Sequence, residues 1–455
     1  MTDSVLVIEG GVVATMDGAR SEHADGHVVI RDGLVEAVGA GPGPAVESDG
    51  PVERLDARGC LVTPGLVNTH HHLYQWVTRG LAVDDGLFGW LTTLYPVWSG
   101  IDEDITGAAA AAGLGWLART GCTTAMDHHY VFPSRGGDVL GATIEAADRV
   151  GLRFLATRGS MDLGVSRGGL PPDDLVEDVD AILAASAAAV SEHHDPGPRS
   201  RLRVGLAPCS PFSVTADLLV ESAKLARDQG VRLHTHLAET QDEDAYCREH
   251  FGCSPVDHLE QLGWLGDDVW FAHGIHFADA EIARLAATGT GVAHCPSSNA
   301  RLGAGICRTR DLRDAGVPVG LGVDGAASNE SGSLVEEARQ ALLMARARGG
   351  PEALTVRDAL ETATIGGARV LGWDDRIGSL EAGKEADVAV WRLDTLAHAD
   401  VVDPVAALVL GTRPPLELLL VSGRPVVEHD RLVTVDEQAL AGEALRHRNA
   451  LLARG

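Results

Sequence analysis

Eight short runs of β-branched and apolar residues recur along the middle of this chain, and Ala- and Leu-rich stretches separate most of them. Stretches such as ITGAAAAAGLGWLART are typical of helices. Eight strand–helix units over about 300 residues predict an α/β fold with a (β/α)8 barrel. The rival is a doubly wound open sheet, but no GxGxxG motif follows an early strand. The expected strands are Leu61–Asn68, Gly121–Asp127, Leu152–Thr157, Leu202–Ala207, Val231–His236, Val269–His273, Gly291–His294 and Val317–Asp324.

Both ends of the chain carry short strand-like segments, such as SVLVIEG and HVVIRDG near the start and EADVAVWRL and LELLLVSG near the end. Neither end is long enough to bury a core alone, so we expect them to build one small β-sandwich together. The predicted organisation is a composite β-sandwich from residues 1–61 and 375–440, a barrel from 62–374, and a helical tail at 441–455.

The composition is that of a globular enzyme-sized protein, with 455 residues, 45% hydrophobic and 22% charged. A formal net charge of -28 and the lack of a Lys/Arg cluster argue against a nucleic-acid partner. The seven cysteines form no CxxC pair and fit neither a disulfide framework nor a zinc finger. No basic n-region opens the chain, and no run of about 18 apolar residues predicts a membrane span. We therefore expect a cytoplasmic protein.

Histidine and acidic residues stand at the ends of several expected strands, where a barrel of this kind forms its active site. His70 and His72 are two residues apart, so in a strand both imidazoles point to one face. In LHTHLAET, His234 and His236 compete, and His236 is nearer the strand end. Three imidazoles and a carboxylate that converge can form a mononuclear catalytic metal site with a base beside it.

Three further residues are candidates for proton transfer. Glu239 follows His236 on the expected loop, where a carboxylate can lie near a metal-bound water without binding the metal. His273 competes with His276 in AHGIHF and is at the strand end. Asp324 ends an apolar strand, and a carboxylate there is costly to bury unless it is paired or binds a metal. We expect Asn299, in HCPSSN, to tie loops together.

Six motifs follow one another along the chain: PGLVNTHHH, HTHLAET, AHGIHF, HCPSSN, GVDG and, near the end, IGSLEAGKEADVAVW. In this order they resemble the amidohydrolase superfamily over nearly the whole chain. The resemblance is to its branch of cytosine, guanine, chlorotriazine and adenosylhomocysteine deaminases. It implies a distorted (β/α)8 barrel flanked by a β-sandwich, and relatives of this kind are often dimers or larger. Binuclear relatives carry a lysine on the fourth strand, which here reads RLRVGLAPCSPFS. The resemblance therefore implies one divalent metal, Zn2+ or Fe2+, bound by His70, His72, His236 and Asp324.

The resemblance also implies roles in catalysis. His273 matches the sixth-strand histidine that contacts water and substrate in this branch. Asp324 and His273 are expected to help take the first proton from the attacking water, and Glu239 to carry a proton to the ring nitrogen. A non-enzymatic scaffold is the rival, but relatives of that kind lose metal ligands, and this chain has the full set.

Further strings suggest the substrate. Gln75 stands three residues after His72, where guanine deaminases carry a glutamine that reads the purine edge. The strings LFGWLTTLYPVW, TTAMDHHYVFP and TRGSMDLGVSRGGLPPD resemble 8-oxoguanine deaminases, and similar strings occur in isoxanthopterin deaminases. A small purine or pterin is thus the expected substrate, with a triazine-type reaction as a further alternative. Tyr130, Arg158 and Cys209 are candidates for the pocket and equally for barrel packing.

Overall fold

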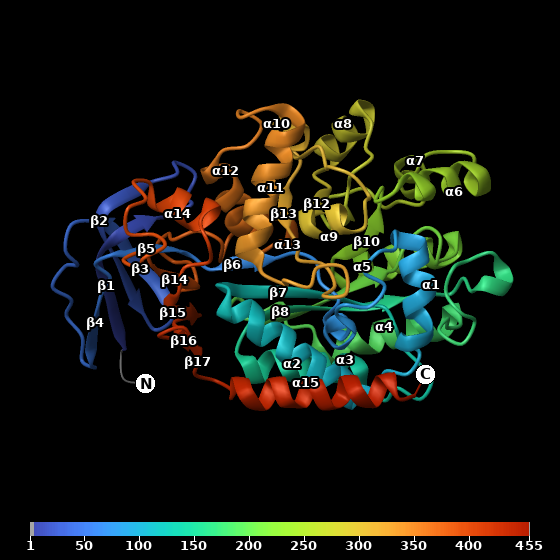
Figure 1. Cartoon of the computed structure of the whole chain (residues 1–455), viewed down its shortest axis with the longest axis horizontal. Coiled ribbons are helices and arrows are strands. Elements are labelled where there is room, and N and C mark those ends of the chain that lie inside the picture. Colours follow the sequence, from blue (N-terminus) through green and yellow to red (C-terminus); the bar gives the residue numbers. More distant parts are fainter. Residues whose placement is uncertain (1–3, 455) are drawn as a thin grey trace.

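The computed structural model describes residues 4–454, and its centre is a closed barrel of eight parallel strands with helices around it (Figure 1). The distorted (β/α)8 barrel predicted from the alternating pattern is confirmed. The barrel strands are β6 (Leu66–Asn68), β7 (Cys122–His129), β8 (Arg153–Ser160), β9 (Leu202–Pro208), β10 (Leu233–Leu237), β11 (Val269–His273), β12 (Gly291–His294) and β13 (Val319–Leu321). Around the barrel they pair in chain order, and β13 closes the ring by pairing with β6.

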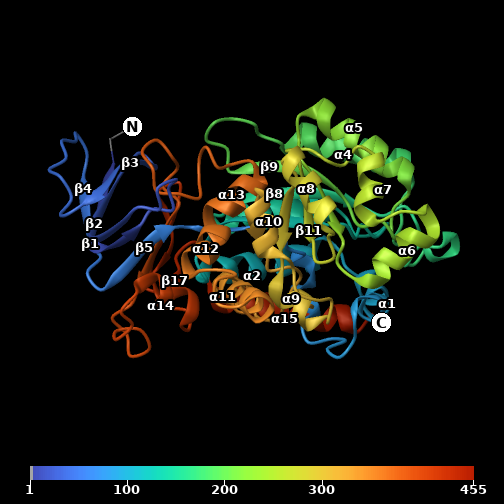
Figure 2. The same cartoon turned by 90° about the horizontal axis from the view of Figure 1, so that it is seen from above.

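A second sheet of nine strands combines both ends of the chain and lies at one end of the barrel (Figure 2). Antiparallel hydrogen bonds between β5 and β14 join the N-terminal strands to the C-terminal ones. The two chain ends therefore share one β-domain, as their short apolar segments predict; a β-sandwich was expected there, and the described strands join in a single sheet. Its strands are β1 (Val5–Ala14), β2 (Glu22–Arg31), β3 (Leu34–Ala40), β4 (Val52–Asp56), β5 (Cys60–Pro64), β14 (Val388–Arg392), β15 (Leu416–Val421), β16 (Arg424–Glu428) and β17 (Arg431–Leu432).

The single strand expected over Leu61–Asn68 is wrong, because the chain breaks there into β5 of the second sheet and β6 of the barrel. Gly65 lies between them, and a Cβ atom at this position would stand 2.1 Å from Cγ2 of Thr123. Only glycine allows so close an approach of the backbone to the neighbouring side chain. The turn at Gly65 therefore passes the chain from one sheet into the other.

Helices surround the barrel. Of these, α1 lies near the carboxyl ends of the strands, and α15 packs along α2 (Figure 1). No helix in the described part of the chain is long and apolar enough to cross a membrane. The helices are η1 (Leu73–Thr78), α1 (Leu87–Trp98), α2 (Glu103–Arg119), α3 (Val139–Val150), η2 (Val165–Arg167), α4 (Val179–His193), α5 (Ala216–Gln229), α6 (Gln241–Phe251), α7 (Pro255–Gln261), α8 (Asp279–Thr288), α9 (Pro296–Arg301), α10 (Thr309–Ala315), α11 (Leu334–Gly349), α12 (Val356–Glu361), η3 (Thr362–Gly366), α13 (Gly367–Leu371), α14 (Pro404–Leu410) and α15 (Glu437–Leu452).

Candidate metal centre and active site

The histidine and acidic candidates lie together, buried, at the carboxyl ends of the barrel strands. His70 and His72 lie just past the end of β6, and not within a strand as the i, i+2 argument assumed. His236 lies in β10, His273 ends β11, and Asp324 follows β13. We call His70, His72, His236 and Asp324 the polar cluster.

The backbone is strained where these strands end. Ala238, His273 and Asp324 have φ values of 54°, 72° and 62°, in the left-handed region that non-glycine residues rarely adopt. Each such residue costs about 1–3 kcal/mol, so it persists only where the surroundings hold it. Strain of this kind concentrates at functional sites, and here three strained residues stand within or beside the polar cluster.

The three histidines of the polar cluster direct their Nε2 atoms inward, because each donates a hydrogen bond from Nδ1 on its far side. His72 donates to the carbonyl oxygen of His128 at 2.7 Å, and His236 donates to that of Cys209 at 2.7 Å. His70 Nδ1 lies 2.8 Å from Nε2 of His234, whose own Nδ1 donates to the Trp270 carbonyl oxygen at 2.9 Å. With the proton on Nδ1, every Nε2 of the cluster presents a lone pair.

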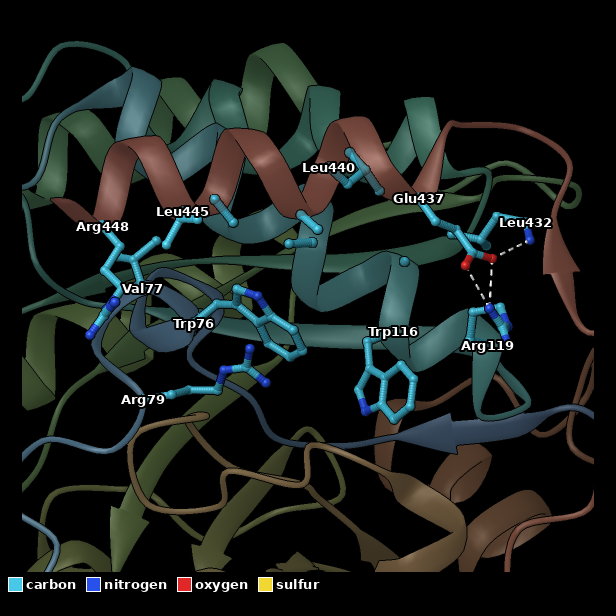
Figure 3. Close-up of a pocket in the computed structure, with 14 residues that line it drawn as sticks. Trp76, Val77, Arg79, Trp116, Arg119, Leu432, Glu437, Leu440, Leu445 and Arg448 are labelled. Carbon is cyan, nitrogen blue, oxygen red and sulfur yellow. Dashed lines mark hydrogen bonds and ion pairs between the residues drawn. The ribbon is translucent and has the colours of Figure 1, made fainter. Parts of the chain in front are cut away.

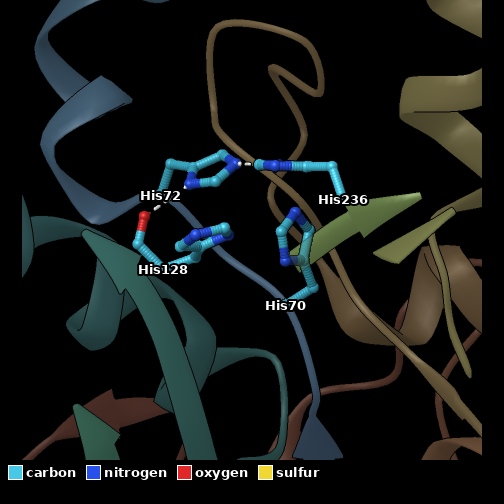
Figure 4. Close-up of side chains that lie close together, drawn as sticks. All are labelled: His70, His72, His128 and His236. Carbon is cyan, nitrogen blue, oxygen red and sulfur yellow. Dashed lines mark hydrogen bonds between the residues drawn. The ribbon is translucent and has the colours of Figure 1, made fainter. Parts of the chain in front are cut away.

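The lone pairs converge. His72 Nε2 and His236 Nε2 are 3.1 Å apart (Figure 4). Asp324 Oδ1 lies 3.2 Å from His70 Nε2 and 3.3 Å from His72 Nε2. Burial lowers the pKa of all three imidazoles, which favours their neutral, ligating form. Two nitrogen lone pairs that face each other without a proton between them repel. A divalent cation bound between the Nε2 atoms would remove this repulsion, so their arrangement fits a metal site.

Asp324 is the anionic member of the polar cluster. Burial alone would raise the pKa of this carboxyl, but the imidazoles of His70, His273 and His72 around it hold that pKa well below its usual range. The Gly325 amide donates to Oδ1 at 2.7 Å, and the Ser328 hydroxyl donates to Oδ2 at 3.2 Å. The carboxylate is therefore ionised and oriented.

His128 is a further candidate ligand that was not predicted from the sequence. Its ring stacks on that of His236, with centroids 4.7 Å apart, and its nitrogen is close enough to those of His70, His72 and His236 to share a metal ion (Figure 4). Its Nε2 donates to the Ala207 carbonyl oxygen at 2.9 Å, and its Nδ1 has no partner among the described residues. A second group of possible ligands, His70, His273 and Asp324, overlaps the first. The sequence signal that could have identified His128 as a candidate ligand is the motif DHH at the end of β7.

Glu239 and His273 stand beside the polar cluster. His273 Nε2 lies 3.5 Å from Glu239 Oε2 and 4.0 Å from Asp324 Oδ2, and its Nδ1 donates to Asn299 Oδ1 at 2.9 Å. Burial raises the pKa of Glu239 to about 7, although the charge of His273 opposes the shift. For His273, burial lowers the pKa, but the charges of Glu239 and Asp324 overcome it and raise the pKa overall. Because both pKa values are raised and the two side chains face each other, the pair is suited to proton transfer.

A small cavity of about 30 Å³ adjoins these residues. Its polar side includes Gln75, His72, Glu239 and His273. Its other side, which we call the cavity wall, is apolar and comes from α1 and two other segments. The cavity wall consists of Leu87, Trp90, Leu91, Tyr95, Phe212 and Leu302. None of the six was predicted, because an apolar residue in a helix or loop looks the same in sequence whether it faces a core or a substrate.

Three of the four predicted pocket residues, Gln75, Tyr130 and Cys209, line this cavity. The Gln75 side-chain oxygen is buried and accepts no hydrogen bond from the described residues. Arg158 does not line the cavity. Its guanidinium pairs with Glu177 at 2.7 Å and covers the Phe132 ring at 3.6 Å, so a role at the substrate lacks a contact to support it.

A larger groove of about 460 Å³ lies elsewhere, between η1, α2 and α15 (Figure 3). Trp76 and Trp116 line it, and Arg79 stacks on the Trp76 ring at 3.8 Å. Neither of the two possible ligand groups in residues 4–454 includes a residue of this groove. Of these two hollows, the smaller cavity is therefore the one that adjoins the polar cluster.

A closed parallel barrel with buried imidazoles and a carboxylate converging at its carboxyl end is the arrangement of a metal-dependent hydrolase. A model of the amidohydrolase family matches residues 61–426, and the chain belongs to this family. It is therefore a hydrolase that acts on carbon–nitrogen bonds. The resemblance found in the sequence motifs is confirmed.

The relatives are enzymes of small heterocycles. The chain is 46% identical to an 8-oxoguanine deaminase of Pseudomonas aeruginosa over 430 residues, 94% of each protein. It is 37% identical to an isoxanthopterin deaminase of an unknown prokaryotic organism, over 98% of this chain and 95% of the relative. The crystal structure of atrazine chlorohydrolase from Arthrobacter aurescens TC1, complexed with zinc, has a TM-score of 0.92 and 33% identity, covering 97% of this chain and 100% of that one. A bound metal and hydrolysis of a heterocycle are thus supported, while a homo-oligomer stays a prediction.

Proposed function

We propose that this enzyme hydrolyses 8-oxoguanine to urate and ammonia, using one zinc or iron ion held by the polar cluster. The observation that carries the proposal is the convergence of three Nε2 atoms and the Asp324 carboxylate beside the buried pair of Glu239 and His273. The substrate comes from likeness, since identity to the 8-oxoguanine deaminase is 46% and to the isoxanthopterin deaminase 37%.

His70, His72, His236 and Asp324 would hold the metal, which would lower the pKa of a water molecule towards about 7 and so make hydroxide available at neutral pH. The side chains of this enzyme then handle the protons. Asp324 and His273 are positioned to accept the proton that the water loses. Glu239, with a pKa of about 7, carries a proton to the ring nitrogen beside the carbon under attack. The oxygen of water bonds to the ring carbon and a proton is added to the ring nitrogen, so the ring C=N bond becomes single. The exocyclic amine then takes up the proton that Asp324 or His273 accepted from the water, its carbon–nitrogen bond breaks, and ammonia leaves as the new hydroxyl loses its proton to become a carbonyl.

Gln75 is the residue that we expect to recognise the heterocycle through a hydrogen bond. Its buried oxygen has no hydrogen-bond partner among the described residues, and an unsatisfied buried acceptor is costly. A ring N–H of the substrate would satisfy it, and a ligand without that donor would be rejected. The cavity of about 30 Å³ holds only one or two water molecules, so a bicyclic ring enters only when the cavity wall moves outward.

The test is the ultraviolet absorbance of purified, metal-loaded enzyme with 8-oxoguanine, guanine and isoxanthopterin in parallel. Rapid formation of urate, with the other two substrates much slower, supports the proposal. Ammonia released fastest from isoxanthopterin would overturn the substrate and leave the hydrolytic mechanism in place. Ammonia from none of the three would overturn both the substrate and its pterin alternative.

A further inference from the structure

The turn that carries Glu239 is held by a second, buried carboxylate. The chain leaves β10, passes through Ala238 in the left-handed conformation, and enters α6 after Thr240. Such a turn is strained unless something fixes it, and the strain falls on the residue before Glu239. The direction of the Glu239 side chain therefore depends on whatever fixes this short segment.

The sequence from Thr240 to Glu243 reads TQDE, which is the pattern of a capping box. In that motif the fourth residue returns its carboxylate to the backbone N–H of the first. One half of the motif is present, because the Thr240 hydroxyl oxygen accepts from the Glu243 amide at 3.2 Å. The ordinary explanation for Glu243 is thus stabilisation of the start of α6.

The carboxylate of Glu243 does not bond to the Thr240 amide, as a capping box requires, but to two amides that precede Thr240 in the chain. Its Oε1 accepts from the amide of Ala238 at 2.9 Å, and its Oε2 accepts from the amide of Glu239 at 2.9 Å. Both oxygens are used, one on the strained residue and one on Glu239 itself. Two parallel bonds of this kind fix orientation as well as distance.

Glu243 is also buried, with 1% of its surface exposed, whereas its neighbour Asp242 is exposed. Burying a carboxylate is costly unless hydrogen bonds compensate for the lost water. A half-buried cap could do the same for α6 at less cost, as Asp102 and Thr215 do for α2 and α5. The burial therefore indicates a task at the site that the carboxylate faces.

We propose that Glu243 is a positioning residue for Glu239: by accepting both amide N–H groups of the Ala238–Glu239 segment, it fixes the turn that aims the Glu239 carboxylate at His273. This inference rests on the proposed role of Glu239 in proton transfer. It assigns no contact with the substrate to Glu243. The carboxyl end of β11 is joined to the same turn, since the amides of Ile275 and His276 donate to the Ala238 carbonyl oxygen at 2.9 and 3.0 Å.

The decisive variant is Glu243→Gln, which keeps the size of the side chain. An amide offers one acceptor oxygen and turns its NH2 group towards the second backbone N–H, so one of the two bonds is lost. Glu243→Asp keeps the charge, but its carboxylate is one methylene shorter and cannot reach both amides. Asp242→Asn is the matched control for charge at the start of α6, and Thr240→Ala is the control for the ordinary cap.

The first measurement is hydrogen exchange of the metal-loaded protein, resolved to single amides. We expect the amides of residues 238 and 239 to exchange about tenfold faster in Glu243→Gln and Glu243→Asp than in the wild type. Asp242→Asn should leave both amides protected. Unchanged protection in Glu243→Gln and Glu243→Asp would overturn the proposal.

The second measurement is turnover. We expect kcat to fall about 10- to 100-fold in Glu243→Gln and Glu243→Asp, with little change in KM or metal content, because a displaced proton carrier affects the reaction more than binding. Asp242→Asn and Thr240→Ala should keep the wild-type kcat. A Thr240→Ala variant as impaired as Glu243→Gln would reduce Glu243 to a helix cap and overturn the proposal.

Failure of the proposed function can be told apart from failure of this inference. The exchange measurement needs no substrate, so it stands even if 8-oxoguanine gives no urate. In that case kcat is measured with whichever heterocycle releases ammonia from the wild type. Fast exchange with unchanged kcat on that substrate would show that the segment is clamped but that Glu239 does not need the clamp, which overturns the inference.

Discussion

The polar cluster and the cavity wall border the same cavity but are built in opposite ways. Each histidine of the cluster has a hydrogen bond on its far side, to His234 or to a backbone oxygen. The cavity wall is apolar apart from groups such as the Trp90 indole, which donates to the Ala327 carbonyl oxygen at 3.2 Å. Directional bonds fix atoms, whereas apolar contacts allow repacking. We therefore expect the barrel to fix the chemistry and the cavity wall to set the range of substrates.

The largest effect should come from breaking the polar cluster. His236→Ala removes one inward Nε2 atom, and we expect loss of bound metal and of all measurable turnover. Chelation of the metal from the wild type should do the same, with recovery on adding Zn2+. His276→Ala is the matched control, because His276 donates from its ring to the Ala304 oxygen and lies outside the cluster. Metal analysis by mass spectrometry and an ammonia assay check this, and full activity in His236→Ala would remove that residue from the ligand set.

A smaller effect is expected when Glu239, the proposed proton carrier, is changed and the polar cluster is left intact. Glu239→Gln should keep the metal but lose about 10²- to 10⁴-fold in kcat. Because burial raises the pKa of Glu239 to about 7, its ionised fraction grows as the pH rises through neutrality. Since Glu239 must hold the proton that it delivers to the ring nitrogen, wild-type turnover should fall on the alkaline side, and the Gln variant should lack that alkaline limb. Wild-type turnover in the variant would exclude Glu239 as the carrier.

The sequence was sufficient for the barrel and for most of the polar side of the cavity. Each of these residues stands in a motif at a strand end, and strand ends of one parallel barrel meet at one face. His70 and His72 lie beyond β6, yet they still converge because the loop there is short and buried. Local patterns therefore identified residues whose placement the barrel dictates.

The site features that could not be predicted from the sequence depend on packing between segments that are distant in the chain. The cavity wall combines α1 with Phe212 and Leu302, which no local pattern brings together. Arg158 was a fair candidate by position, but its charge is taken up by Glu177 on the loop that follows β8. Glu243 matched a capping box, and only the folded chain reveals that its carboxylate passes the cap and reaches Ala238. In each of these cases the role of the residue depends on a contact that forms only in the tertiary structure.

Gln75 lines the cavity between the polar cluster and the cavity wall. Changing it should lower turnover less than changing Glu239. Gln75→Leu replaces a buried, unpartnered acceptor with an apolar side chain of similar size. We expect a roughly tenfold loss in kcat/KM for 8-oxoguanine, the value of about one hydrogen bond. The variant should be as stable as the wild type or more so, because an unsatisfied polar atom is removed. Thermal melting and substrate kinetics test both, and equal losses for heterocycles with and without a matching N–H would contradict a reading role.

The last expected effect concerns the support beneath the polar cluster and is one of stability, with the smallest consequence for turnover. Glu337, fully buried in α11, accepts from the Asn329 side chain at 2.8 Å and from the Ser297 amide at 3.1 Å, and Asn329 also donates to the oxygen of Val323, next to Asp324. Burial raises the pKa of Glu337 from 4.5 to about 8, against the opposing hydrogen bonds of Ser297 and Asn329. The folded protein thus keeps a proton that the unfolded chain releases.

This shift fixes the sign of a pH dependence. The contribution of Glu337 to the free energy of unfolding is complete below pH 4.5 and is lost as the pH rises through about 8. Glu337→Gln carries no titrating group, so the wild type should lose on the order of a few kcal/mol relative to it between those values. Urea unfolding of both proteins at pH 5 and pH 8 measures the difference, with the exposed neighbour Glu336→Gln as the matched control. If wild type and Glu337→Gln keep the same difference at both pH values, Glu337 is ionised in the folded protein, and the support of Asp324 is a charged group like the cluster above it.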